Sequence, residues 1–196
     1  MTFRKTMSAA LAVCFLAAGA ATAATYAIDA THSSVGFKVR HMMVSKVTGT
    51  FGEFSGTIEY VEGQPGQWSA SATIATASVN TNDAKRDGHL SGADFFDAEK
   101  HPEITFVSKG VRQKGDGLVL VGDLTMHGAT KPVELELEFN GAMTDPWGND
   151  RIGFSAKGVL DRRDFGISYN TVLDKGGVAV GNEVELMLEI EAIAAK

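Results

Sequence analysis

The side chains that could perform chemistry in this chain of 196 residues are few and widely spaced. The histidines occur singly, at His32, His41, His89, His101 and His127. The one cysteine, Cys14, cannot form a disulfide within the chain. No HExxH, GxGxxG or P-loop pattern occurs, and the nearest approach to GxSxG, at 153–157, ends in lysine. We therefore expect no catalytic residues of these well-known designs.

A metal site would have to gather histidines from distant parts of the chain. His41-Met42-Met43 offers soft donors beside one imidazole. Each histidine also has a structural interpretation, because His41 ends a predicted strand, His127 precedes a glycine in a turn, and His89 belongs to a polar insert. We therefore expect neither a metal nor a cofactor.

Two clusters of arginine and aspartate are the remaining polar candidates, Arg86-Asp87 and Arg162-Arg163-Asp164. The simpler interpretation is that they tie loops together through charge-assisted hydrogen bonds. The functional interpretation is a polar rim that meets the head group of a ligand. An Asp–Arg–His acid–base site is a third interpretation, but no spacing supports it.

Residues 1–23 have the features of a secretory signal peptide. Arg4 and Lys5 precede an apolar stretch from Met7 to Ala18, and residues 21–23 form a small-x-small cleavage site. Cys14 lies within the apolar stretch and would be lost on cleavage. Cleavage would remove two of the 18 basic residues and none of the 24 acidic ones, so the net charge would change from −6 to −8. We expect an exported protein, with residues 24–196 as one domain, that does not bind nucleic acid.

Alternation of apolar and polar residues dominates the remaining 173 positions and predicts about eight or nine antiparallel strands. The clearest run places Val133, Leu135, Leu137 and Phe139 on one face, with glutamates between them. Glycine-rich turns separate the runs, which favours hairpins. The segment 82–100 breaks the pattern and predicts one or two short helices, with Asn82 as the N-cap. The pattern alone leaves a sandwich and a barrel open.

An outer-membrane barrel is a further alternative that an exported β-rich chain allows. Such barrels carry aromatic girdles at both interfaces, whereas this chain has three tyrosines and two tryptophans. We therefore expect no stable membrane insertion, although transient contact with a membrane stays open, as does a homodimer.

An ordered set of motifs along residues 26–166 resembles the YceI-like family of polyisoprenoid-binding periplasmic proteins. The motifs are Tyr26-Ala27-Ile28-Asp29, Phe37-Lys38-Val39, Gly49-Thr50-Phe51, Arg86-Asp87-Gly88-His89-Leu90, Asp94-Phe95-Phe96-Asp97, Pro102-Glu103-Ile104-Thr105-Phe106, Asp123-Leu124-Thr125-Met126-His127-Gly128 and Arg163-Asp164-Phe165-Gly166. Each motif alone is weak, but their order and spacing are specific.

The resemblance implies an all-β fold, a lipocalin-like antiparallel barrel with a short helical insert. It also implies that a hydrophobic channel binds a long isoprenoid, such as a polyprenyl phosphate or a quinone tail, and that the protein belongs to the exported stress proteins. Under that implication the inward-facing apolar residues line the channel: Phe37, Val39, Phe54, Ile58, Tyr60, Ile74, Phe106, Leu135, Leu137, Phe139 and Phe154. The candidate head-group contacts are Arg86, His89 and Arg163.

Two other functions compete with this hypothesis. A hydrolase that acts on an apolar substrate at the barrel mouth would need histidines and carboxylates to converge on one pocket. A structural module would instead pack the same apolar residues into a solid core.

Overall fold

The computed structural model describes residues 23–173 and 176–195, so the predicted signal peptide lies outside the described residues except for Ala23. The strands are β1 Ala24–Ile28, β2 Ser34–His41, β3 Ser45–Phe51, β4 Phe54–Tyr60, β5 Ser69–Ala75, β6 Val79–Asn80, β7 Glu103–Lys114, β8 Gly117–Met126, β9 Ala129–Thr144, β10 Asp150–Asp161 and β11 Val180–Ala194. The helical elements are α1 Ala84–Ser91 and the 3-10 turns η1 Pro65–Gln67, η2 Thr76–Ser78 and η3 Arg162–Phe165.

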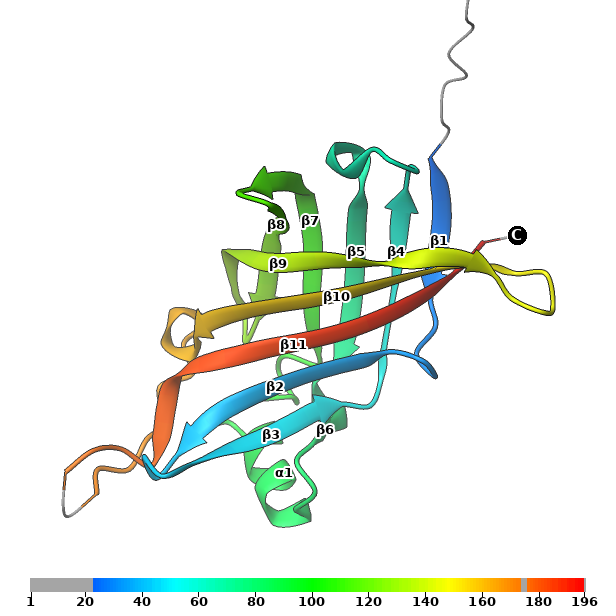
Figure 1. The fold of residues 1–196 in the computed structure, drawn as a ribbon. Coiled ribbons are helices and arrows are strands. Elements are labelled where there is room, and N and C mark those ends of the chain that lie inside the picture. Colours follow the sequence, from blue (N-terminus) through cyan, green and yellow to red (C-terminus); the bar gives the residue numbers. More distant parts are fainter. Residues whose placement is uncertain (1–22, 174–175, 196) are drawn as a thin grey trace, which may run out of the picture.

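Eight of these strands close into an antiparallel barrel, which confirms the predicted fold. The order β1-β4-β5-β7-β8-β9-β10-β11 returns to its start because β11 pairs with β1 at Tyr26 and Ala194. The other end of β11 pairs with β2, which continues into β3 and β6. Figure 1 shows β9, β10, β11, β2 and β3 crossing in front of the wall formed by β8, β7, β5, β4 and β1.

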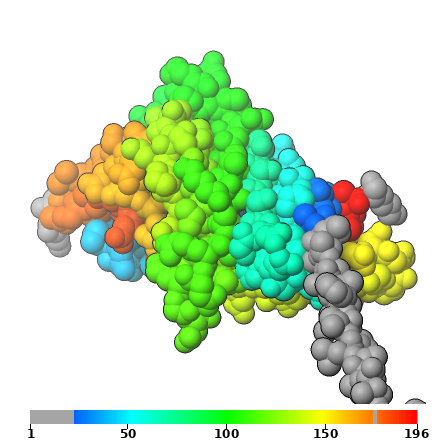
Figure 2. All heavy atoms as spheres, turned by 90° about the horizontal axis from the view of Figure 1, so that it is seen from above, coloured from blue at the N-terminus to red at the C-terminus, as the bar shows by residue number. Residues whose placement is uncertain are grey.

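Alternating side chains give each strand one apolar face and one face that meets water. Closure of the barrel buries the apolar faces on the inside. The apolar residues on the inner face form two clusters of buried residues, one around Tyr60 and Trp68 and the other around Phe51 and Phe165. In the view from above, the green segments around residues 100–125 lie between the orange segment and the cyan strands (Figure 2). The strands β7 and β8 form the side of that wall next to β9.

The insert between β6 and β7 contains one described helix, α1, in agreement with the prediction of short helices. The predicted N-cap is wrong by one residue, because Asp83 accepts the hydrogen bond from the Arg86 amide at 3.0 Å. Asn82 instead adopts a left-handed backbone with a φ of 62°. The helix ends at Gly92, after eight residues.

In the part of the chain that the structure describes, no helix has the length and apolar character that crossing a bilayer requires.

Candidate functional site

A cavity of about 240 Å³ lies inside the barrel, between the two buried clusters. Its exposed wall is entirely apolar. On β11 the residues Val184, Leu186, Leu188 and Ile190 all face it, because alternate residues of a strand point to the same side. That run covers about 20 Å at the usual rise of a strand. The cavity can therefore hold an extended apolar chain.

Eight of the eleven residues predicted for the channel line this cavity: Phe37, Val39, Phe54, Ile58, Ile74, Phe106, Leu137 and Phe154. They come from β2, β4, β5, β7, β9 and β10, so the wall is assembled from strands distant in sequence. Leu90, Phe95 and Phe96 of the insert also contribute. The insert thus forms part of the wall, which the alternating pattern did not predict.

Three of the predicted residues, Tyr60, Leu135 and Phe139, do not line the cavity. Tyr60 and Phe139 stack at 5.4 Å between ring centroids, and Trp68 lies 5.3 Å from Tyr60 and 5.4 Å from Phe139. Leu135 is buried and packs against Gly158, which has no side chain. A Cβ added to Gly158 would lie 2.6 Å from Cδ2 of Leu135. We call Tyr60, Trp68 and Phe139 the aromatic plug, because they fill the barrel where the cavity ends.

The three candidate head-group residues lie outside the cavity, and each is held by neighbours. Arg86 donates to the side chain and the carbonyl of Thr81, at 2.7 and 2.8 Å. His89 Nε2 is 3.0 Å from a carboxylate oxygen of Asp94.

Arg163 is 57% exposed and donates to Asp161, which lowers the pKa of that carboxyl to about 2. All three residues make their observed contacts with residues nearby in the sequence, and these contacts hold the local structure together.

Arg162 is the charged residue that lines the cavity. It belongs to the predicted polar cluster Arg162-Arg163-Asp164, but it was not among the predicted head-group contacts. Its side chain is buried, and its guanidinium donates to the carbonyls of Ile167 and Gly181 at 2.9 Å and of Val180 at 3.5 Å. Burial lowers its pKa. No carboxylate of the described residues lies within 4.0 Å of this cation.

The local structure explains why Arg162, and not Arg163, points inward. Side chains at i and i+3 of a 3-10 turn share one face, so Arg162 and Phe165 are both buried in η3. The sequence alternation also predicts an inward side chain at position 162. The inward-facing residues Ile152, Phe154, Ala156 and Leu160 of β10 are spaced by even numbers of residues, and position 162 continues that spacing.

Among the described residues, two groups of side chains offer ligand atoms to a metal ion. Asp29, His32 and Glu191 form the first group, and Asp97, His101 and His127 form the second. The first is already bridged by Arg151, which contacts both of its carboxylates. None of the five histidines, all of which the structure describes, lines the cavity.

Comparisons with known proteins agree on one family. The family model for the YceI-like domain matches residues 26–192. Protein YceI of Escherichia coli is 42% identical over 181 residues, which cover 91% of this chain and 92% of that protein.

Two solved structures share the fold. BcnA of Burkholderia cenocepacia superposes with a TM-score of 0.73 at 24% identity, covering 84% of this chain and 99% of that one. A polyisoprenoid binding domain from Saccharophagus degradans superposes with a TM-score of 0.63 at 17% identity, covering 87% and 98%.

Proposed function

The chain belongs to the YceI-like family, and from this premise and the cavity we propose that it is a soluble periplasmic protein that binds a long isoprenoid lipid. The ligand would be a polyprenyl phosphate or an isoprenoid quinone, held for transport, storage or sequestration. The observation that carries the proposal is the apolar cavity that runs between the two buried clusters. A solid core would leave no such space.

The energetics of the cavity favour reversible binding over permanent capture. An isoprenoid tail gains roughly 0.8 kcal/mol for each methylene-sized group that leaves water. Because the bilayer offers the tail an equally apolar environment, transfer between membrane and barrel would be nearly neutral. A protein of this design can therefore exchange a tail with a membrane without inserting into it.

The head group would lie at the cavity end formed by the insert and η3. Arg162 supports this placement, since it is a buried cation beside the apolar wall, and no carboxylate of the described residues forms an ion pair with it. Three of its five N–H groups donate to the protein, and under this proposal the other two would donate to the head group. Under this proposal Arg162 takes the role that the sequence analysis gave to Arg86, His89 and Arg163.

A binding protein fits the described residues better than a hydrolase does. A hydrolase acting on a bound tail would need a nucleophile or base in the cavity wall, and the wall is apolar and contains no histidine. Asp97, His101 and His127 form a cluster of titratable side chains, but none of the three lines the cavity.

Native mass spectrometry of protein purified without detergent tests the proposal. We expect bound isoprenoid, or uptake of offered octaprenyl phosphate or ubiquinone-8 at one molecule per chain. A consistently empty barrel that takes up neither lipid would contradict the proposed function. Fractionation of cells tests the periplasmic location separately, by comparing the periplasmic and cytoplasmic extracts.

A further inference from the structure

We propose that Asp97, His101 and His127 form a binding site for one divalent transition-metal ion of the zinc type. The site would join the insert to the turn between β8 and β9. It is independent of the lipid proposal, because none of the three residues lines the cavity.

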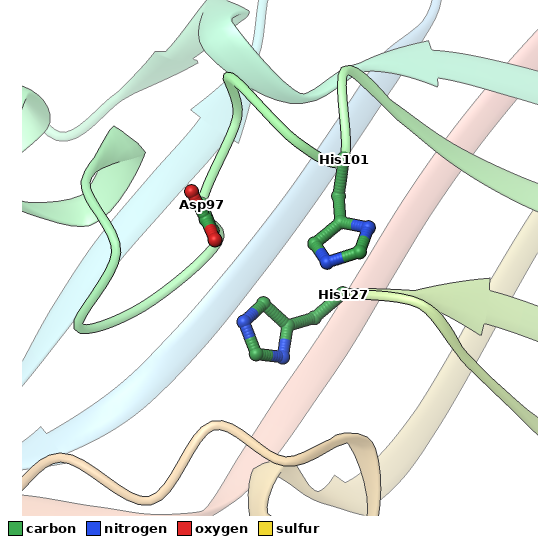
Figure 3. Close-up of side chains that lie close together, drawn as sticks. All are labelled: Asp97, His101 and His127. Atoms are coloured by element: carbon green, nitrogen blue, oxygen red, sulfur yellow. The ribbon is translucent and has the colours of Figure 1, made fainter.

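The fold brings these three residues together from separate segments of the chain. Asp97 belongs to the insert, His101 precedes β7, and His127 lies in the turn that follows β8. One ligand atom from each residue lies within 4.8 Å of the other two, and all three residues are partly buried. Figure 3 shows the two imidazoles close together with the carboxylate of Asp97 beside them, and the ring centroids are 5.0 Å apart.

The tautomer of His127 is the one that a metal ligand requires. Its Nδ1 is 3.0 Å from the carbonyl oxygen of Phe165, and a carbonyl can only accept, so Nδ1 carries the proton. The lone pair of a neutral ring is then on Nε2. Histidines that bind metals through one nitrogen usually donate the other N–H to a carbonyl or carboxylate in this way.

His101 is held close to His127 without a polar partner of its own. Within the described residues neither of its ring nitrogens makes a hydrogen bond to protein. Its close approach depends on Gly128, because a Cβ there would lie 2.8 Å from Cε1 of His101. Two adjacent imidazoles therefore face the same region, and neither Nε2 of His127 nor a ring nitrogen of His101 has a hydrogen-bond partner among the described residues.

Asp97 supplies the negative charge. Its Oδ2 accepts from Lys100 at 2.9 Å, and this hydrogen bond holds the pKa of the carboxyl below its usual value. Within the described residues the other carboxylate oxygen, Oδ1, accepts no hydrogen bond, so it is available to a second partner.

Asp97 and His127 adopt left-handed backbones, with φ of 47° and 51°, a conformation that Asp and His adopt more readily than most residues other than glycine.

The ligand set selects the class of metal. Two imidazoles and one carboxylate suit zinc and its neighbours in the first transition row, whereas calcium and magnesium prefer oxygen ligands. Three protein ligands leave a fourth tetrahedral position for water. The other group, at Asp29, His32 and Glu191, is a poorer candidate because Arg151 already neutralises its carboxylates.

Titration of chelator-treated, tag-free protein with Zn²⁺ and with Co²⁺ tests the site. Where residues 1–23 are still attached, the protein should carry Cys14→Ser, so that the one thiol of the sequence cannot contribute. We expect one equivalent of Zn²⁺ to bind, a rise in melting temperature, and a Co²⁺ absorption spectrum typical of tetrahedral coordination. Binding should weaken at pH values where imidazole is protonated.

Single substitutions locate the site. His101→Gln, His127→Gln and Asp97→Asn should each weaken Zn²⁺ binding at least tenfold, while the matched controls His41→Gln and His32→Gln should leave it unchanged. Circular dichroism of the metal-free variants separates loss of ligands from loss of fold, and Asp97→Asn preserves the shape of its side chain. Absence of stoichiometric Zn²⁺ binding, or binding that persists in both His101→Gln and His127→Gln, would overturn the proposal.

Discussion

The indole N–H of Trp68 donates a hydrogen bond to the carbonyl oxygen of Val61 at 2.7 Å. Both residues are buried, at 6% and 1% exposure. The bond fixes the indole where the aromatic plug meets the cavity, so Trp68 closes one end of the space proposed to hold the lipid. The same hydrogen bond therefore contributes to the stability of the barrel and holds the side chain that bounds its cavity.

Trp68→Phe should destabilise the barrel by about 1–3 kcal/mol, because the Val61 carbonyl keeps only the Gln64 amide as a donor and the smaller ring leaves buried space unfilled. The free energy of unfolding in urea, followed by far-UV circular dichroism, measures this loss. Trp147→Phe is the matched control, since Trp147 is 81% exposed and its substitution should change the stability by less than about 0.5 kcal/mol. Equal effects of the two substitutions would contradict the structural role given to Trp68.

Trp68 should also report binding by its fluorescence. In Trp147→Phe the remaining indole lines the cavity, so an isoprenoid quinone that enters should quench its emission. In Trp68→Phe the remaining indole is on the surface, and the same quinone should leave the emission nearly unchanged. Quenching of similar size in both variants would indicate contact outside the barrel.

Ala72→Phe should reduce lipid binding at least tenfold, because the new ring would occupy the cavity that Ala72 lines. Ser71→Phe is the control, since the neighbouring residue of a strand points to the opposite face and Ser71 is exposed. Uptake of octaprenyl phosphate by the two variants, compared in native mass spectra, provides the measurement. If Ala72→Phe takes up as much lipid as Ser71→Phe, the ligand lies elsewhere.

Arg162→Gln should weaken binding of an anionic polyprenyl phosphate more than binding of a neutral quinone, by about tenfold in relative affinity. The reason is that only the phosphate gains from the guanidinium charge. Because both lipids are measured on the same variant, a general loss of stability affects them equally. Arg163→Gln serves as control, since Arg163 is exposed and already paired with Asp161. A parallel loss for both lipids would remove Arg162 from the head-group site.

Arg151 should control the acid stability of the barrel. It donates to Asp145 at 2.7 Å, and this hydrogen bond keeps the pKa of Asp145 far below its ordinary value of 3.8. A carboxyl with a lowered pKa in the folded state contributes stability above its ordinary pKa, and that contribution is lost as the pH falls towards the folded value.

Arg151→Gln should therefore move the acid unfolding midpoint, measured by circular dichroism between pH 5 and pH 1, to higher pH. Lys157→Gln is the control, because Lys157 is exposed on the same strand. An unchanged midpoint in Arg151→Gln would show that the hydrogen bond does not contribute to acid stability.

The alternation of residues determined that the fold consists of antiparallel strands and which faces of them point inward, whereas it left a sandwich and a barrel open. A strand has a period of two residues, so the run Val133, Leu135, Leu137 and Phe139 had to place one face inside, as β9 does. The order of short motifs along the chain by itself indicated the family, and the family comparison agrees with it.

The position of a residue along the barrel axis could not be obtained in the same way. Leu137 lines the cavity, whereas Phe139 joins the aromatic plug and Leu135 packs against Gly158, although all three have the same place in the period. Periodicity assigns a side chain to a face, but its neighbours across the barrel decide whether it meets empty space or another ring.

Convergence of distant residues was likewise decided only by the tertiary structure. Twenty-five residues separate His101 from His127, and the sequence gives no reason for their rings to meet. They meet because β7 and β8 pair as a hairpin, with the start of one strand beside the end of the other. Composition and spacing thus identified the residues that are chemically able to bind a ligand or a metal. Strand pairing determined which of them lie close together.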